Sequence, residues 1–357
     1  MQQLILAINP GSTSTKIAVY RSTERIFIKS INHSAEDLQD FKNIASQFKF
    51  RMQIILDELQ SAHIELDNIT AIMGRGGLVK PIPSGVYAVN EILKEDLRIG
   101  VMGQHASNLG GLIADEIASH LPAAKAYIVD PVVVDEFEDI ARISGHPAFE
   151  RKSIFHTLNQ KAIARNHAKT HHLDYNELNL IVCHMGGGIS VGAHKKGKVV
   201  DVNQALDGDG PFSPERSGSL PMGDVLEAAF SGNYTLDEMK KMLVGKGGYM
   251  AYLETNDAYK VETDAKNGDK KATLIQEAMA YQVAKEIGAM STVLNGDVSA
   301  ILLTGGIAYG KPFINLLSQR IQHIGRIFVY PGEDEMRALA MNGLRVIMGE
   351  AEIMEYK

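Results

Sequence analysis

A short polar segment near the N-terminus carries side chains that could bind phosphate. Its sequence, INPGSTSTK (residues 8–16), follows an apolar run. The candidate side chains are those of Asn9, Ser12, Ser14 and Lys16. They alternate along the chain, so on a strand that returns after a glycine-centred turn they share one face. Such a turn exposes hydroxyls and backbone N–H groups, which suit phosphate; a solvated polar hairpin is the alternative.

A second segment repeats this pattern half a chain later. In NLIVCHMGGGISVGAHKKGKVVDV (residues 179–202), an apolar run ends at His184, where the first segment has Asn9. The glycines of the following turn are Gly186, Gly187 and Gly188. Because consecutive glycines cost backbone entropy, we expect a ligand or another backbone segment to approach closely there. His184 is either a structural histidine at the end of a buried strand or a hydrogen-bond donor to phosphate.

These two segments do not match the best-known nucleotide-binding motifs. The Walker spacing GxxxxGK[ST] is absent from the first, and the second lacks GxGxxG followed by a helix. However, an apolar strand followed by glycines also occurs in each half, as AIMGRGG (residues 71–77) and AILLTGG (residues 300–306). Two such pairs in the same order predict an internal duplication. Gly305 and Gly306 precede a helical pattern, and a nucleotide could lie on their backbone.

Two arginines in predicted turns or loops could bind anionic groups. Arg216 lies in a long loop, residues 207–221, and Arg75 lies in the turn GRGG. The planar guanidinium of Arg216 would suit a transferring phosphoryl group, although a solvated surface arginine is the alternative. Arg75 could bind the carboxylate of a substrate.

Two carboxylates lie at the ends of predicted elements. Asp130 ends a strand just before Pro131, and Glu335 begins a C-terminal helix. Asp130 either caps the turn or holds Mg²⁺ and positions the nucleophile. Glu335 either interacts with the helix dipole or contributes a carboxylate near a metal ion.

The composition is that of an ordinary globular protein. A length of 357 residues favours two domains, each with its own core. The net charge of −7 argues against nucleic acid as a partner, and the single cysteine, Cys183, favours a reducing compartment. The N-terminal apolar run is too short for a signal peptide, and no stretch approaches the ~20 apolar residues that cross a bilayer. We therefore expect a soluble, cytoplasmic protein.

Strand-like and helical patterns alternate along the chain, which predicts an α/β fold. We expect helices at residues 35–63, 105–120, 154–167, 271–294 and 335–347. Besides the hairpins, we expect strands at residues 71–73, 126–129, 300–304 and 326–329. The polar, irregular stretch before residue 154 suggests a domain boundary, with domains 1–150 and 151–334 and a C-terminal segment, 335–357, that could pack on the first domain.

A series of motifs resembles those of the acetate and butyrate kinases, which belong to the superfamily of actin, sugar kinases and heat-shock ATPases. In order, the motifs are AINPGSTSTK, GQHASNLGG, KSIFHTLNQKAIAR, CHMGGGISV, ERSGSLP and LLTGGIAYG. The resemblance covers essentially the whole chain. The stretch GRGGLVKPIPSGVY (residues 74–87), the GGG turn and the length resemble the butyrate branch, because acetate kinases carry HGG and GNG turns.

The resemblance implies two duplicated ribonuclease-H-like domains with ATP in a cleft between them, and a homodimer or higher homo-oligomer. It also implies Mg²⁺-dependent transfer of the ATP γ-phosphoryl group to butyrate or a branched analogue, which gives an acyl phosphate and ADP. The first domain would bind the acid and the phosphates, and the second the nucleotide. Since a carboxylate is already ionised at neutral pH, the site needs positive charge and positioning rather than a general base.

Matching the motifs position by position, together with the patterns above, assigns a role to each candidate residue. The catalytic residues would be Arg216, His184, Asp130 and Arg75. The acid would contact His105, Arg75, Phe155 and His156. The nucleotide and its phosphates would contact Asn9, Ser12, Ser14, Lys16, Gly186, Gly187, Gly188, Gly305 and Gly306. The metal ion would lie near Glu335, Asn9 and Asp130.

Two departures from the acetate kinase pattern affect these roles. Arg75 stands where that branch has a histidine, and Ile72 stands where it has its arginine. Gly187 replaces an asparagine, which leaves only backbone N–H groups to contact phosphate. Two alternatives remain: a sugar kinase, with Asp130 as the base that hydroxyl substrates need, and an actin-like or chaperone-like ATP switch.

Overall fold

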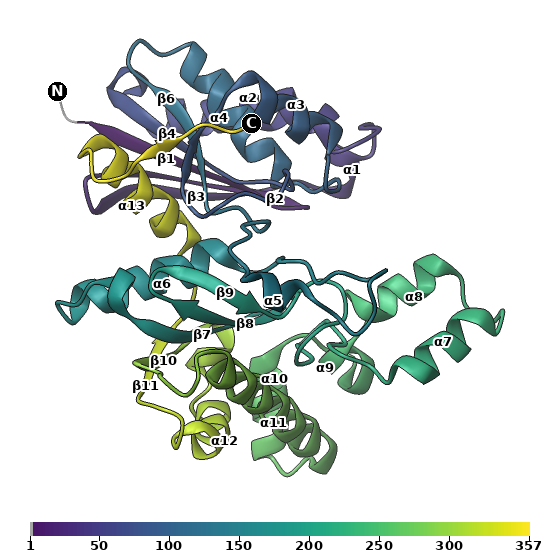
Figure 1. Ribbon diagram of the computed structural model, residues 1–357. Coiled ribbons are helices and arrows are strands. Elements are labelled where there is room, and N and C mark those ends of the chain that lie inside the picture. The colour runs from purple at the N-terminus through teal and green to yellow at the C-terminus, as the bar shows by residue number, and fades with distance from the viewer. Residues whose placement is uncertain (1–2) are drawn as a thin grey trace. The chain divides into compact units, whose positions relative to one another are not determined.

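The chain folds into two compact units. The computed structural model describes residues 3–357, apart from the side chain of Ala35. Unit 1 comprises Met1–Val134 and Asp334–Lys357, and unit 2 comprises Asp135–Glu333. Each unit contains one mixed β-sheet with helices packed against it, which confirms the predicted α/β class (Figure 1).

The sheet of unit 1 has 7 strands in the order β12-β5-β6-β4-β1-β2-β3. The strands are β1 (Leu4–Pro10), β2 (Ser14–Arg21), β3 (Glu24–Asn32), β4 (Ile69–Arg75), β5 (Val86–Ala88), β6 (Lys125–Val129) and β12 (Ile353–Met354). β1, β2 and β3 form an antiparallel meander, and β4 and β6 lie parallel to β1 on its other side. β5 is antiparallel to β6, and β12 is parallel to β5.

Helices cover both faces of this sheet. They are α1 (Ala35–Leu38), α2 (Phe48–Ser61), α3 (Glu91–Ile99), α4 (Asn108–Ser119) and α13 (Glu335–Ile347). Leu6 belongs to a buried apolar cluster with Ile55 of α2 and Leu109 of α4. Its neighbour Ile5 faces the other way, and a Cβ at Gly343 of α13 would lie only 2.8 Å from it. The C-terminal helix therefore packs on the first unit.

The sheet of unit 2 has 5 strands in the order β11-β10-β7-β8-β9. They are β7 (Asn179–Met185), β8 (Ile189–Lys195), β9 (Lys198–Val202), β10 (Ala300–Gly305) and β11 (Ile327–Pro331). β7, β8 and β9 form an antiparallel meander, and β10 and β11 continue the sheet in parallel. This is the arrangement of β1, β2, β3, β4 and β6 in unit 1, so the predicted duplication is visible in the topology.

Helices also pack on both faces of the second sheet. The helices of unit 2 are α5 (Asp139–Arg142), α6 (Thr157–Thr170), α7 (Met222–Phe230), α8 (Leu236–Leu243), α9 (Gly248–Leu253), α10 (Ala258–Lys266), α11 (Lys270–Val293) and α12 (Lys311–Ile321). Ile181 of β7 shares a buried cluster with Met279 of α11 and Leu317 of α12. The adjacent Leu180 packs with Ala164 of α6, on the opposite face.

Two predicted helices are shorter in the structure. Of the expected helix 35–63, only α1 and α2 are α-helical, because Asn43 and Ser46 bond each other's backbone between them. The Ser46 N–H donates to Asn43 Oδ1 at 2.9 Å, and the Ser46 hydroxyl donates to Asn43 O at 2.6 Å. Such local bonds compete with helical ones. The expected helix 105–120 begins at residue 108, since His105 Nδ1 accepts from the Ser107 N–H at 3.2 Å.

The segment 135–150, which we assigned to the first domain, packs on unit 2. Phe137 forms a buried cluster with Val199 and Val202 of β9, and the Glu138 N–H donates to Val200 O at 3.2 Å. Within residues 3–357, no helix is long and apolar enough to cross a membrane.

Candidate functional site

The polar face of the first hairpin is continued by residues from two other elements of unit 1. Asn9 of β1 lies directly opposite Lys16 of β2, so their side chains leave the sheet on the same face. The Asn9 amide donates to Glu335 Oε2. Arg75, at the end of β4, donates to Asn9 Oδ1 at 3.3 Å and lies 2.8 Å from Glu335 Oε1. The structure thus joins three predicted site residues that are far apart in the sequence.

The local fold explains why these side chains meet. Because β1 and β4 are parallel neighbours, their carboxyl ends lie next to each other, which brings Asn9 and Arg75 together. Glu335 is the first residue of α13, whose N-cap is Asp334, and the carboxylate lies at the positive end of that helix. Arg75 is half-buried beside it, so each charge compensates the other. Ser14 and Lys16 extend from β2 on the same face as Asn9.

Asp130 occupies a strained, buried position after β6. Its φ is 41°, in the left-handed region that a non-glycine residue rarely adopts, and only 2% of its surface is exposed. Its Oδ1 accepts from the Ser84 hydroxyl at 2.6 Å and from the Gly85 N–H at 3.0 Å. These bonds fix the turn that leads into β5. A metal contact for Asp130 stays a prediction.

His105 lies just before α4, on an exposed part of unit 1. Its Nδ1 is 2.8 Å from the Ser107 hydroxyl. His105 thus bonds its own loop, and Asp130 bonds the turn before β5, whereas Asn9, Arg75 and Glu335 form one connected group.

In unit 2, two predicted histidines lie against each other. His184 ends β7 and is 1% exposed, and its ring centroid is 4.3 Å from that of His156. His184 Nε2 lies 3.1 Å from Glu333 Oε2, and His156 Nδ1 lies 2.9 Å from the Ser190 hydroxyl. His184 Nδ1 is buried and has no hydrogen-bond partner among the described residues. Phe155, next to His156, is 3% exposed and packs in the core.

The glycine turn of the second hairpin makes room for Arg216. A Cβ at Gly188 would lie 2.0 Å from Arg216 Nη1, and one at Gly187 would lie 3.0 Å from Glu215 Oε1. The turn is also held by the Ser213 hydroxyl, which donates to Gly187 O at 2.6 Å. The group that approaches the glycines in this structure is therefore an arginine side chain, which our interpretation of the sequence did not include.

Arg216 is a poorly compensated cation. It donates to Ala205 O, while its buried Nε has no partner in the described part of the chain. Burial lowers the pKa of its guanidinium, an effect that Glu215 and Asp207 oppose. Because a buried cation is costly without an anionic partner, this site favours the binding of an anion.

The two glycines after β10 have different surroundings. Gly305 has a φ of 93°, and a Cβ there would lie 2.2 Å from Met185 O, so it allows β10 to pack closely beside the end of β7. Nothing lies within 4 Å of the position that a Cβ at Gly306 would take. The backbone at Gly306 is therefore open, and its contact with a nucleotide stays a prediction.

Two residues at these sites were not found from the sequence. Arg51 of α2 is fully buried and bonds the turn of the first hairpin. The sequence could have indicated Arg51, because it lies between Phe48 and Ile55 on the apolar face of the predicted helix. A charged residue on a face that is expected to be buried requires an explanation. Glu333 gave no local signal, because its pairing with His184 joins residues far apart in the sequence.

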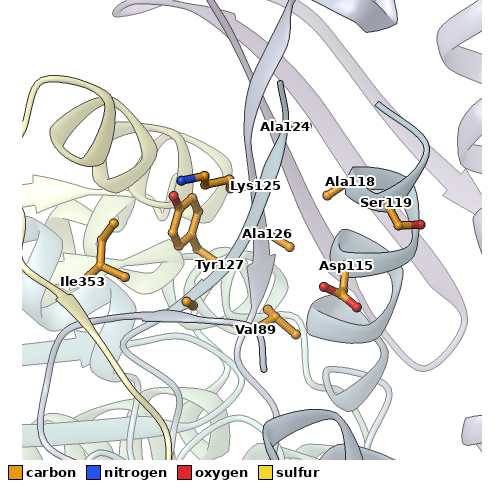
Figure 2. Close-up of a pocket in the computed structure, with 10 residues that line it drawn as sticks. Val89, Asp115, Ala118, Ser119, Ala124, Lys125, Ala126, Tyr127 and Ile353 are labelled. Carbon is orange, nitrogen blue, oxygen red and sulfur yellow. The ribbon is translucent and has the colours of Figure 1, made fainter. Parts of the chain in front are cut away.

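Unit 1 contains a pocket with a volume of about 400 Å³. Figure 2 shows the residues that line it. Small apolar side chains and Tyr127 form most of its wall, with Asp115 and Lys125 as its charged groups. None of the predicted site residues lines this pocket. Among residues 3–357, no group of three or more His, Cys, Asp or Glu side chains is arranged to hold a metal ion.

Comparison with known proteins places the chain in a family. The model of the acetokinase family matches residues 148–346. The chain is 56% identical to butyrate kinase 1 of Clostridium acetobutylicum, over 99% of both chains, and 54% identical to butyrate kinase 2 of that organism, over 100% of both. The chain belongs to the acetokinase family. The resemblance identified from its motifs is thereby confirmed.

A solved structure supports the fold independently. An acetate kinase from Porphyromonas gingivalis superposes with a TM-score of 0.79 at 18% identity, covering 97% of this chain and 100% of that one. The fold is that of the actin-like ATPases, with two ribonuclease-H-like domains. As a kinase of this family, the protein uses ATP or ADP.

Proposed function

We propose that the protein is a butyrate kinase, which reversibly transfers the γ-phosphoryl group of ATP to a short-chain carboxylate. The high identity to curated butyrate kinases over the whole chain supports this function. The structural observation that carries it is Arg216, a half-buried side chain beside the glycine turn of β7 and β8, whose buried Nε has no hydrogen-bond partner among residues 3–357.

The chemistry requires positive charge more than proton transfer. A carboxylate oxygen attacks the γ-phosphorus while the bond from that phosphorus to the bridging oxygen of ADP breaks, so the products are acyl phosphate and ADP. The acid is already ionised, and no proton has to be removed. Arg216 would offset the repulsion between the two anions, as arginines do in other phosphoryl transfers. His184 Nδ1, which is buried and has no hydrogen-bond partner in the described part of the chain, would bond an oxygen of the same group.

The unit 1 residues fit the phosphates and a magnesium ion. Kinases commonly hold Mg²⁺ through one or two carboxylates plus the substrate phosphates, so a cage of protein ligands is not required. Glu335, with Asn9 beside it, would provide this contact, and the sequence also suggests Asp130. Bound there, Mg²⁺ would neutralise charge on the phosphates. Ser12, Ser14 and Lys16 would contact the phosphates directly.

The acid would be recognised by charge at one end and by apolar contact at the other. Each additional buried CH₂ contributes roughly 0.8 kcal/mol, so two more than in acetate are enough for selectivity. Arg75 is paired with Glu335, which orients its guanidinium at the carboxyl ends of β1 and β4. We assign the carboxylate contact to Arg75 and the remaining contacts to His105, His156 and Phe155.

Trapping of acyl phosphate tests the proposal. The protein, ATP, Mg²⁺ and hydroxylamine are incubated with acids of increasing length and with branched acids, and the hydroxamate is measured. We expect the highest kcat/KM for a four-carbon or branched short-chain acid. Absence of product with every acid would refute the function, and ADP formation with a sugar instead would indicate a sugar kinase.

We also propose that the protein is a homodimer that uses the hairpin of α7 and α8. Neither helix contains a buried residue, although Met222, Leu226 and Phe230 form an apolar stripe along α7. Figure 1 shows this hairpin projecting from unit 2. Short helices need packing for stability, so a partner is expected to cover them.

Charge complementarity favours a second copy as that partner. α7 carries Asp224 and Glu227, whereas α8 carries Asp237 and Glu238 in its first turn and Lys240 and Lys241 in its last turn. Two copies related by a two-fold axis can therefore pair the carboxylates of α7 with the last turn of α8. Light scattering should give a dimer for the unmodified protein and a monomer for Phe230→Ser. Leu274→Ser, at an apolar residue 63% exposed on α11, is the control and should remain dimeric. A dimeric Phe230→Ser variant would exclude this surface.

A further inference from the structure

α2 carries a positive charge into the core of unit 1. Arg51 is 0% exposed, and burial lowers the pKa of its guanidinium, which forms no ion pair with a carboxylate of residues 3–357. The guanidinium bonds backbone carbonyl groups instead. It donates to Gly11 O at 2.7 Å, Ser12 O at 3.0 Å and Ser14 O at 3.0 Å. All three carbonyls belong to the turn of the first hairpin or to the residue that follows it.

Other side chains fix the orientation of this guanidinium. Gln47 Oε1 accepts from Arg51 Nε at 3.0 Å and from Nη2 at 2.8 Å, and Thr15 Oγ1 accepts from Nη1 at 3.1 Å. The Thr15 hydroxyl is also 2.8 Å from His33 Nε2. Burying a cation costs far more than burying an apolar side chain of similar size. Packing of the core therefore does not explain why position 51 holds an arginine rather than an apolar residue.

Because the peptide bond is planar, Arg51 also determines where the N–H groups of the turn point. In a planar trans peptide, the C=O and the following N–H point in opposite directions. Because Arg51 holds the carbonyls of Gly11 and Ser12, the N–H groups of Ser12 and Thr13 point away from it. Both residues are exposed, and the described backbone offers no acceptor to either N–H. Successive N–H groups that face one side form a concave site for an anion.

We infer that Arg51 is a positioning residue, which holds the first hairpin turn so that the Ser12 and Thr13 N–H groups bind a terminal phosphoryl group of the nucleotide. The inference rests on the proposed kinase function and assigns the phosphate contact to backbone as well as to side chains. Arg51 itself does not touch the nucleotide. Its effect is to keep the two N–H groups oriented before the nucleotide binds, which lowers the cost of binding and of transfer.

Arg51→Lys, with Thr15→Val as a matched control, tests this role. A lysine keeps the charge but lacks the planar fork that reaches several carbonyls at once. We expect Arg51→Lys to lower kcat/KM for ATP by about 10²-fold, with the KM for the acid little changed. Binding of ADP, measured by calorimetry, should weaken more than binding of AMP, because AMP lacks the terminal phosphates. Thr15→Val removes one hydrogen bond of Arg51 but none of its carbonyl contacts, and Gln47, which accepts two bonds, still orients the guanidinium. This variant should therefore lower Tm while leaving these ratios unchanged.

The outcomes separate this inference from the proposed function. If folded Arg51→Lys has a lower Tm but unchanged ATP kinetics and an unchanged ADP-to-AMP affinity ratio, Arg51 is only structural and the inference is wrong. If that variant does not fold, Gln47→Met, which removes the acceptor that aims the guanidinium, is measured in the same way, and the same unchanged ratios would refute the inference. Failure of the unmodified protein to form acyl phosphate would instead refute the kinase, and ADP and AMP binding would still test Arg51.

Discussion

The two hairpin turns have the same place in their sheets but use arginine in different ways. The turn between β1 and β2 is bonded from the core side by Arg51, whose guanidinium holds three backbone carbonyls. The turn between β7 and β8 is approached by Arg216, which takes the space that a Cβ at Gly188 would need. In the first turn the arginine is enclosed by hydrogen bonds. In the second, its Nε has no partner among the described residues.

This difference shows how a duplicated unit can acquire two roles. The first copy keeps polar side chains and a fixed backbone, which suits positioning of phosphates. The turn of the second copy consists of glycines, which leave space for the guanidinium of Arg216. That guanidinium can still bind an anion. Two changes in or beside these turns would test this contrast, and a third, at Glu286 of α11, tests a buried charge of unit 2.

The largest effect is expected from Arg216→Ala. Loss of the guanidinium removes the charge that offsets the transferring phosphoryl group, and kcat should fall by on the order of 10³ or more, as for arginine fingers. The Kd for ATP, measured by calorimetry, should change little, since the first turn would still bind phosphate. Arg216→Lys should recover part of kcat. Near-normal turnover of Arg216→Ala would contradict the role of the second turn.

A smaller effect is expected from an alanine in the second turn, with the same change in the first turn as its control. A Cβ at Gly188 would lie 2.0 Å from Arg216 Nη1, so Gly188→Ala must displace the guanidinium, and kcat should fall by about 10²-fold. A Cβ at Gly11 would lie 3.4 Å from Ser14 Oγ, an ordinary contact, so Gly11→Ala should keep kcat within a few-fold. Equal losses in both variants would remove the distinction between the turns.

The smallest effect concerns stability and pH. Burial, with Asp209 and Asp201 nearby, raises the pKa of Glu286 to about 7 from its ordinary value of 4.5. The folded state therefore holds this proton more tightly than the unfolded chain does, and the stability that the proton contributes is lost as the pH rises from about 4.5 to about 7.

Glu286→Gln should accordingly stabilise the protein at pH 8 by about 2 kcal/mol and have little effect at pH 5, as measured by urea unfolding. Glu277→Gln, on the exposed side of the same helix, is the control. A pH-independent difference would exclude this titration. The first turn should lack such sensitivity, because Arg51 stays charged over this range.

Much of the fold could be predicted from local patterns. The apolar strand, the glycine turn and the returning strand recur in both halves, and the structure contains both hairpins and the parallel strands beside them. The long helix predicted at residues 271–294 is α11, shifted by one residue. The helix predicted at residues 35–63 is interrupted between α1 and α2, because the mutual bonds of Asn43 and Ser46 satisfy the backbone locally.

The candidate site could be predicted residue by residue but not as a set of contacts. Asn9, Arg75 and Glu335 were each identified from type and position, whereas their bonds depend on the pairing of β1 with β4 and on the packing of α13. Periodicity says nothing of such distant pairs. Arg51 was overlooked for a related reason. Its partners are backbone carbonyl groups, which every residue has, so the sequence does not indicate which of them a side chain will bond.

The return of residues 334–357 to unit 1 has a consequence for biosynthesis. This segment contributes Glu335 to the polar group at β1 and β4, and it buries Tyr356, whose hydroxyl donates to Asp96 at 2.6 Å. On the ribosome, the whole of unit 2 emerges before this segment does, so unit 2 can complete its core while unit 1 still lacks a helix. We therefore expect nascent chains that end near residue 333 to expose the apolar face that α13 later covers, and to depend on chaperones until synthesis is finished.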